Sequence, residues 1–329
     1  MRSEMTRPST RPAGPASGAH GAEHEPVMLA ETLEALAPRP GERVIDGTAG
    51  LGGHSRALLK AIAPGGELIA MDRDPRALRI ARARLSAMPD PCRSTATVRF
   101  WLGEFGGAGQ AAGEAGWVDG ADAILFDLGV SSMQLDAPDR GFSFLRDGPL
   151  DMRMNPDAGM SAAEWLAWVD EEELARVIRA YGDEPRARKI ARKIAAERRR
   201  RPITTTKELA RLVSAAVGGL RGRRHPATRT FQAVRMAVND EAGALRRGLD
   251  AARAALAPGG RLAVISFHSG EDRQVKQAFA EWTRTNWGAC LWAGARRPGL
   301  EERLANRRAR SAKLRAFRRR RRGENGDGP

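Results

Sequence analysis

The stretch Val44–Ser55, VIDGTAGLGGHS, contains the transition that decides the fold. Its first residues end an apolar strand, its middle is a glycine-rich turn, and its last residues begin a helix. Glycines at such a turn allow the backbone to come close to a bound nucleotide. The stretch therefore predicts an α/β protein that binds a nucleotide at the carboxyl end of its first strand.

Strands and helices alternate on both sides of this turn. The strands are expected in Arg43–Asp46, Gly66–Asp74, Thr97–Phe105, Ala121–Ser132 and Arg261–Phe267. Helical spacing separates most of them, so they should form parallel βαβ units and a doubly wound, Rossmann-like sheet. Four residues fall at or just beyond strand ends and are expected to face one crevice: Asp46, Asp72, Phe105 and Asp127.

A different pattern occupies residues 134–225, where no sheet strand is expected. Helices are expected over Ser161–Tyr181, Pro185–Arg200 and Thr205–Val217. We therefore expect a mostly helical insertion domain, which divides the sheet domain into residues 23–133 and 226–317. The remaining residues, 1–22 and 318–329, are polar, and we expect them to be disordered tails.

Composition limits the classes of function. The chain has 55 Lys+Arg against 40 Asp+Glu, a net charge of +15, and this surplus favours a polyanionic partner, either nucleic acid or an anionic membrane surface. The two cysteines, Cys92 and Cys290, have no CxxC spacing, so neither a disulfide framework nor a zinc site is indicated. Neither an apolar run of membrane-spanning length nor a signal core is visible. A cytoplasmic protein without a metal is the simplest expectation.

The turn itself favours one nucleotide over another. Gly50 and Gly52 match the start of the dinucleotide fingerprint G-x-G-x-x-G, but Ser55 stands at its third glycine. The acidic residue Asp46 just before the turn is closer to the loop of enzymes that use S-adenosylmethionine (SAM). Asp72 ends the second strand, where a carboxylate would accept both ribose hydroxyls, but NAD enzymes share that feature. A turn that only joins helix to sheet remains an alternative.

The segment ILFDLGVSS places Asp127 directly after the fourth strand. Enzymes that methylate amino groups carry an acidic or amide residue at this position. An exocyclic amine on a base is a poor nucleophile, since its lone pair is delocalised into the ring. An acceptor that binds the amine hydrogens can orient the nitrogen for attack on a methyl sulfonium. Asp127 is therefore a candidate catalytic residue, or alternatively a cofactor contact or a loop cap.

Several segments cover roughly His24–Arg315: HEPVMLAETLEAL, VIDGTAGLGGHS, AMDRDPRAL, DLGVSSMQLDAPDRGFSFLRDGPLDMRM, HPATRTFQAVRMAVNDE, APGGRLAVISFHSGEDRQVK and NRRARSAKLR. Together they resemble one family, the bacterial 16S ribosomal RNA cytosine-N4 methyltransferases. The resemblance implies SAM-dependent methylation of the N4 amine of one cytidine in the decoding centre of the small ribosomal subunit. It also implies a Rossmann-like domain with a helical insertion that recognises 16S ribosomal RNA.

The resemblance also implies a set of site residues. Its cofactor contacts fall on Gly52, Gly53, His54, Asp72 (ribose), Phe105 (adenine), Asp127 and Gln134, and all seven positions hold the expected residue type. Two departures are visible. Gly270 replaces the leucine usual in FHSxEDR, and Arg307 replaces a proline that usually follows the asparagine.

Three features admit more than one interpretation. Phe142 and Phe144 could stack on an extruded base or pin a loop to the core. His268 could act as a base, although Ser269 with Asp272 spells a capping box, which we favour. The polar side of the helix in RTFQAVRMAVN could touch RNA, close the crevice or face solvent.

Two basic runs, Arg186–Arg201 and Arg303–Arg322, are expected to lie outside the strands that build the cofactor site and to contact RNA phosphates. Two rival classes of function remain at this stage. One is an NAD-dependent oxidoreductase on the same sheet, and the other is a non-catalytic RNA-binding assembly factor with a vestigial pocket. Oligomeric state is not indicated by the sequence.

Overall fold

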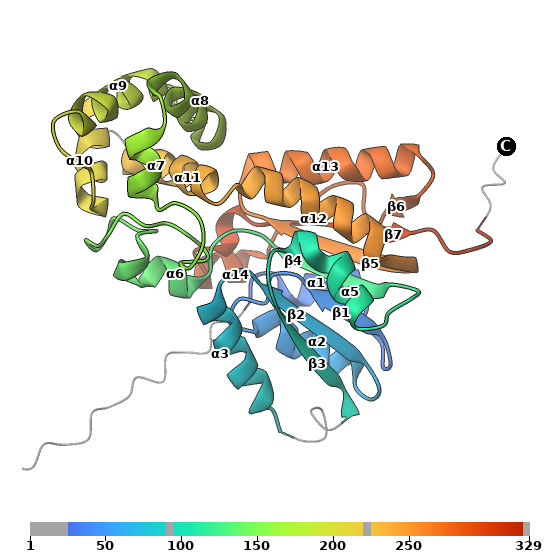
Figure 1. Cartoon of the computed structure of the whole chain (residues 1–329). Helices are drawn as coiled ribbons and strands as arrows, with labels where there is room; N and C mark the ends of the chain where they lie inside the picture. Colours follow the sequence, from blue (N-terminus) through green and yellow to red (C-terminus); the bar gives the residue numbers. More distant parts are fainter. Residues whose placement is uncertain (1–25, 90–94, 220–224, 325–329) are drawn as a thin grey trace, which may run out of the picture.

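The computed structural model describes residues 26–89, 95–219 and 225–324. The expected amino-terminal tail and Cys92 lie outside these ranges. The described residues form a seven-stranded sheet in the order β3-β2-β1-β4-β5-β7-β6 (Figure 1). The strands are β1 (Arg43–Asp46), β2 (Glu67–Asp72), β3 (Thr97–Leu102), β4 (Ala121–Asp127), β5 (Leu256–Ser266), β6 (Gly288–Cys290) and β7 (Lys313–Arg319). Strands β1 to β5 pair in parallel, which confirms the expected Rossmann-like sheet.

Helices cover both faces of the sheet, and successive residues of a strand point into opposite layers. In β1, for example, Val44 packs in one core and Ile45 in the other. One face is covered by α1 (Leu29–Leu36), α2 (Gly53–Ile62) and α3 (Pro75–Ser86), and the other by α5 (Ala108–Glu114), α12 (Glu241–Ala255) and α13 (Ser269–Arg284). The apolar stripe of each helix faces the sheet, as in α13, where Val275, Phe279 and Trp282 are buried.

The last strand corrects one expectation. Residues 318–329 were expected to be a disordered tail, yet β7 runs to Arg319 between β5 and β6. The strand was missed because its many basic residues outnumber the apolar ones. Leu314, Ala316 and Phe317 are nevertheless buried. A sequence rich in arginine can form a sheet strand because its apolar residues alone reach the core. Residues 325–329 lie outside the described ranges.

The expected insertion forms a separate helical lobe with its own core (Figure 1). Its helices are α7 (Ala162–Trp168), α8 (Glu171–Gly182), α9 (Ala187–Arg198), α10 (Thr206–Val217) and α11 (Ala227–Val238). The core of this lobe extends beyond residue 225, the boundary expected from the sequence, because Phe231 and Val234 of α11 are buried in it. Helix α11 thus belongs to the lobe by its contacts and leads directly into α12 on the sheet.

Short helical segments connect these layers near the carboxyl ends of the parallel strands. They are η1 (Phe105–Gly107), α6 (Ser132–Asp136), η2 (Pro138–Arg140), α14 (Leu300–Ala305) and η3 (Ala309–Ser311). In the part of the chain that the structure describes, every helix is too short or too polar to cross a membrane.

Candidate functional site

A cavity of about 410 Å³ opens where the parallel strands end. One wall is formed by the turn after β1 and by the ends of β2 and β4, and the other by α11, α12 and the start of α13. Its volume lies within the range of small-molecule sites. Of the seven expected cofactor residues, six line the cavity, namely Gly53, His54, Asp72, Phe105, Asp127 and Gln134.

Gly52, the seventh, does not line the cavity but shapes the turn behind it. It is the N-cap of α2 and has a φ of 84°, a left-handed conformation that side chains rarely adopt. A Cβ atom at this position would also lie 3.3 Å from the Cα of Ala81 in α3. Glycine is therefore required here by the backbone and by the close approach of α3.

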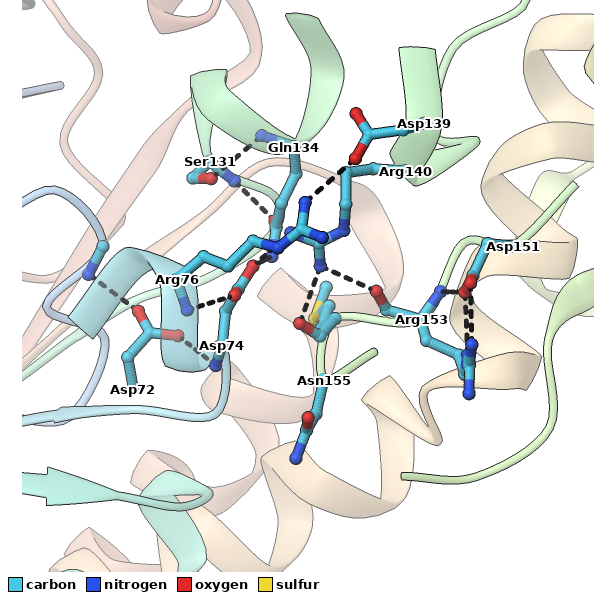
Figure 2. Close-up of polar contacts among 12 residues, drawn as sticks. Asp72, Asp74, Arg76, Ser131, Gln134, Asp139, Arg140, Asp151, Arg153 and Asn155 are labelled. Atoms are coloured by element: carbon cyan, nitrogen blue, oxygen red, sulfur yellow. Dashed lines mark hydrogen bonds and ion pairs between the residues drawn. The ribbon is translucent and has the colours of Figure 1, made fainter. Parts of the chain in front are cut away.

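Asp72 stands at the end of β2 with its carboxylate held by two backbone groups (Figure 2). Its Oδ2 accepts a hydrogen bond from the backbone N–H of Gly50 at 2.7 Å, and its Oδ1 accepts one from Asp74 at 2.8 Å. Burial, with smaller contributions from the negative charges of Asp74 and Asp46, raises the pKa of Asp72 to about 6. The carboxylate is thus fixed in place, and a nearby cation would stabilise its ionised form.

Asp46 was expected to face the crevice, and this expectation is wrong. Its side chain is fully buried because the turn after β1 folds over it. It accepts hydrogen bonds from the Ser55 hydroxyl at 2.6 Å and from the backbone N–H of Thr48 at 3.2 Å. Burial nevertheless raises its pKa to about 6, so its negative charge still acts on the cavity wall.

Asp127 lies at the end of β4 beside His54. The ring of His54 donates from Nε2 to the carbonyl of Val27 at 3.1 Å, so its Nδ1 faces Asp127 Oδ2 at 3.6 Å. Burial lowers the pKa of His54 to about 4, which keeps the ring neutral. Burial and the charges of Asp46 and Glu271 raise the pKa of Asp127 well above its ordinary value. Its Oδ1 is buried without a hydrogen-bond partner among the described residues.

Phe105 and Gln134 complete the wall on which Asp72 lies. The ring of Phe105 packs on Phe126 with centroids 4.8 Å apart. The Gln134 amide is used within the protein, because its Nε2 donates to Asp74 Oδ2 at 2.8 Å and its Oε1 accepts from the backbone of Ser131 at 3.0 Å. Gln134 therefore joins the loop after β4 to the loop after β2.

A buried ion pair below this wall was not foreseen from the sequence (Figure 2). The Arg140 guanidinium, 3% exposed, donates to Oδ2 of the fully buried Asp74 at 2.8 Å. Its other nitrogen donates to the carbonyls of Arg153 and Met154, each at 2.9 Å. Arg140 thus fixes the segment that joins β4 to the helical lobe against the cofactor wall. The only sequence signal was the arginine of the RGFSF segment.

The opposite wall carries two further polar pairs. Arg235 donates twice to Glu241, both at 2.7 Å, and His268 Nε2 lies 3.1 Å from Glu271 Oε1. Ligand atoms of Glu241, His268 and Glu271 lie within 4.8 Å of one another, as in a metal site. However, Arg235 already occupies both oxygens of Glu241, and Glu271 accepts backbone N–H groups at the start of α13. We therefore interpret Glu241, His268 and Glu271 as hydrogen-bonded polar residues of the cavity wall and not as metal ligands.

The capping box expected at Ser269 and Asp272 is shifted by one residue. His268 is the N-cap of α13, and its ring accepts from the backbone of Glu271, whose carboxylate binds back to the His268 N–H. Asp272 instead accepts from Lys313 at 2.7 Å and from Arg315 at 2.8 Å. The cap was placed incorrectly because these two partners come from β7, a strand that was not expected.

The remaining alternatives are resolved by burial. Phe142 is 6% exposed in the core of the helical lobe, and Phe144 packs on Phe231 at 4.8 Å between ring centroids. Both rings pin a loop and neither lines the cavity. On the polar side of α11, Gln232 and Arg235 line the cavity, so this face closes the crevice.

Comparisons with known proteins agree over most of the chain. A model of the MraW methylase family matches residues 21–320. The protein named ribosomal RNA small subunit methyltransferase H from Methylococcus capsulatus is 50% identical over 303 residues, which cover 88% of this chain and 98% of that protein. Its namesake from Thermomicrobium roseum is 48% identical over 315 residues, 89% of this chain and 92% of that protein. The crystal structure of a SAM-dependent O-methyltransferase from Thermotoga maritima is 12% identical with a TM-score of 0.40, covering 90% of this chain and 66% of that chain.

Proposed function

This chain belongs to the MraW methylase family, and we propose that it transfers a methyl group from SAM to the N4 amine of a cytidine in the 16S RNA of the small ribosomal subunit. The names of its relatives support a small-subunit RNA as substrate. The choice of cytidine N4, and of a position in the decoding centre, rests on the family resemblance and on the chemistry of Asp127.

One observation carries the proposal for SAM. Asp46, Asp72 and Asp127 gather where β1, β2 and β4 end, and no lysine or arginine of the described residues forms an ion pair with any of them. Burial is the largest cause that raises the pKa of each of the three carboxyl groups, so a positive charge nearby would stabilise their ionised forms. SAM carries a sulfonium and an ammonium group, so it would supply the missing positive charge. The dinucleotide NAD would instead bring the negative charge of its pyrophosphate.

The residues of the cavity fit the cofactor part by part. Asp72 would accept the ribose hydroxyls, Phe105 would cover one face of the adenine, and the turn with Gly53 and His54 would hold the amino-acid part. When bound, SAM supplies an electrophilic methyl group on its sulfonium. The protein has only to present the amine in line with that methyl group and to exclude water.

Asp127 is proposed to orient the amine. Its unpartnered Oδ1 is an acceptor in a buried position, and an unmet acceptor there costs free energy unless a ligand donates to it. The N4 amine offers two hydrogens, and a hydrogen bond from one of them would hold the nitrogen lone pair toward the methyl group. The methylated amine is acidic, so its extra proton can leave without a dedicated strong base.

Mapping of methylcytidine tests the proposal directly. Small-subunit RNA from a strain that lacks the gene should have no N4-methylcytidine at the target position, and complementation with the wild-type gene should restore it. The purified protein with SAM should methylate small subunits from that strain. An unmodified cytidine after incubation with folded, SAM-bound protein would contradict the proposal and favour the non-catalytic assembly factor.

The oxidoreductase alternative is tested by ligand-induced stabilisation. SAM should raise the melting temperature of the protein, while NAD at the same concentration should leave it unchanged. A stronger shift with NAD would favour the oxidoreductase. At the start of α2, Ser55 stands where the dinucleotide fingerprint has its third glycine, so the turn does not complete that motif.

The outer face of α9 is proposed to contact RNA phosphates. Arg188, Lys189 and Lys193 are exposed on it, and no ion pair within the described residues engages them. Other members of the run are occupied internally, because Arg186 and Arg198 donate to backbone carbonyls in the helical lobe. Such contacts would hold the RNA in register without reading its sequence.

The double variant Lys189→Gln/Lys193→Gln tests this surface. We expect weaker RNA binding and a salt dependence whose slope falls by up to about one unit per lost phosphate contact. The control, Arg39→Gln/Lys60→Gln, removes two exposed charges near the amino ends of the parallel strands, away from the cavity. Equal salt slopes for the two double variants and the wild type would show that α9 is only solvated.

A further inference from the structure

One cation on the cavity wall has no partner. Arg308 lines the cavity, and within residues 26–89, 95–219 and 225–324 its guanidinium forms no hydrogen bond or ion pair. The other arginines of the wall are engaged: Arg73 with Asn239 and Glu104, Arg84 with the carbonyl of Leu51, and Arg235 with Glu241. A guanidinium that is partly withdrawn from solvent and unpaired loses hydration without gaining a partner, so its position favours a ligand.

The backbone around Arg308 is fixed. The neighbouring Ala309 is fully buried and Ala312 nearly so, and the Arg308 N–H donates to Asn306 Oδ1 at 3.0 Å. On the carboxyl side, the chain continues into β7 at Lys313, which is held by Asp272. Arg308 is thus presented to the cavity by a braced segment, and this arrangement lowers the ordering cost of binding.

Arg308 lies on the wall away from the cofactor residues. It lines the cavity with Ser311 and with Phe267, which follows β5, whereas the proposed SAM contacts come from the ends of β1 to β4. Its charge interacts with Asp136 in α6 and, less strongly, with Asp127, yet it forms an ion pair with neither. The cavity therefore has a hydrogen-bond acceptor at Asp127 and a donor at Arg308, and this pair suits a ligand that carries both a donor and an acceptor.

The geometry points to Arg308 as the residue that binds the N3 and O2 atoms of the target cytosine, while Asp127 accepts from its N4 amine. This inference rests on the proposed function. Along its pairing edge, cytosine presents a donor at N4 and then two adjacent acceptors at N3 and O2. The planar fork of a guanidinium matches two adjacent acceptors. Uracil has an N–H at position 3, which would point at the fork, so the same pair of residues selects cytosine. Enzymes that modify extruded bases read this edge in the same way.

The test uses the full-length protein with small ribosomal subunits from a strain lacking the modification. Arg308→Met should lower the single-turnover rate of methyl transfer about 5- to 150-fold, the range for losing a bidentate contact to a base. SAM affinity, from calorimetry, and the salt slope of subunit binding should stay at wild-type values. Guanidinium ions at millimolar concentration should partly restore the rate, whereas sodium ions at equal ionic strength should not.

Two further variants make the result specific. Arg246→Met removes the same charge from an exposed side chain of α12, outside the cavity lining and both basic runs, and should keep the wild-type rate. Arg308→Lys keeps the charge without the fork, so it should bind SAM normally and still lose rate. It carries the test if Arg308→Met does not fold.

Each other outcome overturns the inference in a recognisable way. A salt slope reduced by about one unit would make Arg308 a phosphate contact. Weakened SAM binding would make it a cofactor contact, and an unchanged rate would leave it without a role. If the wild-type protein itself transfers no methyl group to cytidine, the proposed function fails, whatever the variants do.

Discussion

Asp72 and Asp74 are two residues apart, yet they occupy opposite kinds of environment (Figure 2). Asp74 is fully buried and shares Oδ2 between the Arg140 guanidinium and the Gln134 amide. Asp72 faces the cavity, is held only by backbone N–H groups and has no cationic partner among the described residues. The charge of the first carboxylate is balanced by a cation of the fold itself, whereas the second has only backbone donors.

The same distinction separates other carboxylates of the molecule. Asp272 is paired with Lys313 and Arg315, and its pKa is held below the ordinary value. Asp46 and Asp127 are unpaired by any lysine or arginine described, and their pKa values are raised, mainly by burial. Paired carboxylates thus hold the architecture, whereas the unpaired ones lie at the strand ends, where Asp72 and Asp127 line the cavity and Asp46 lies beneath the turn. Each of the following predictions tests one side of this comparison.

Breaking the paired side should have the largest effect. Arg140→Met leaves the Asp74 charge buried without its cation, and we expect a loss of about 3–5 kcal/mol in the free energy of unfolding. Denaturant titration at pH 7.5 or so measures it. The double variant Asp74→Asn/Arg140→Met removes both charges, and asparagine can still cap α3, so it should recover much of this stability. If the single and double variants are equally unstable, the charge of Asp74 is not the cause.

On the unpaired side, Asp72→Asn should affect binding and not folding. Loss of the charge should weaken SAM affinity by about 1–3 kcal/mol, the scale of a charge-assisted hydrogen-bond pair. Stability should hold, because the neutral amide removes repulsion from Asp46 and Asp74. Calorimetric titration and thermal melting of the same sample separate the two effects. A folded variant with wild-type SAM affinity would sink the ribose assignment.

Asp127→Asn should act on the chemical step. The amide keeps an acceptor oxygen but loses the negative charge that faces the sulfonium and the amine. We expect single-turnover methyl transfer at least about tenfold slower, a loss of roughly 1.4 kcal/mol of transition-state stabilisation. Binding of small subunits serves as the control and should be unchanged. A wild-type rate would remove Asp127 from the mechanism.

The unpaired side should also respond to pH. The pKa of Asp72 in the empty site, about 6, is above its ordinary value, so the carboxyl takes up a proton as the pH falls through that value. A cationic cofactor favours the ionised form, so binding should release protons. SAM affinity should be highest above about pH 7 and fall by about tenfold per pH unit per titrating group below pH 6. Asp72→Asn should flatten this dependence, and calorimetry in buffers of different ionisation enthalpy measures the protons released.

The sequence predicted those parts of the site that are local along the chain. The turn with Gly52 and the ends of β2 and β4 follow from strand, turn and helix signals within a few residues. The parallel sheet then brings Asp72 and Asp127 to one edge without further information. The position of Asp46 beneath the turn was not predictable, because the path of the turn decides on which side the carboxylate lies.

The contacts that span long sequence separations were not predicted. Asp74 and Arg140 are 66 residues apart, and Asp272 and Arg315 are 43 apart. No periodicity links such residues, since their pairing depends on how the loop after β4 and the last strand return to the sheet. The basic run that contains β7 was interpreted from its charge, which concealed the buried Phe317.

Strand β7 also imposes an order on biosynthesis. It is the last sheet strand along the chain but lies inside the sheet, between β5 and β6. Chains emerge from the ribosome amino-terminal end first, so β1 to β4 can assemble while β5 still lacks its neighbour. Arg308 immediately precedes η3 and β7, and the wall that carries it is completed only after β7 has docked. A nascent chain would therefore bring the ends of β1, β2 and β4 together before Arg308 is in place, and it would leave an unpaired edge on β5 in the interval.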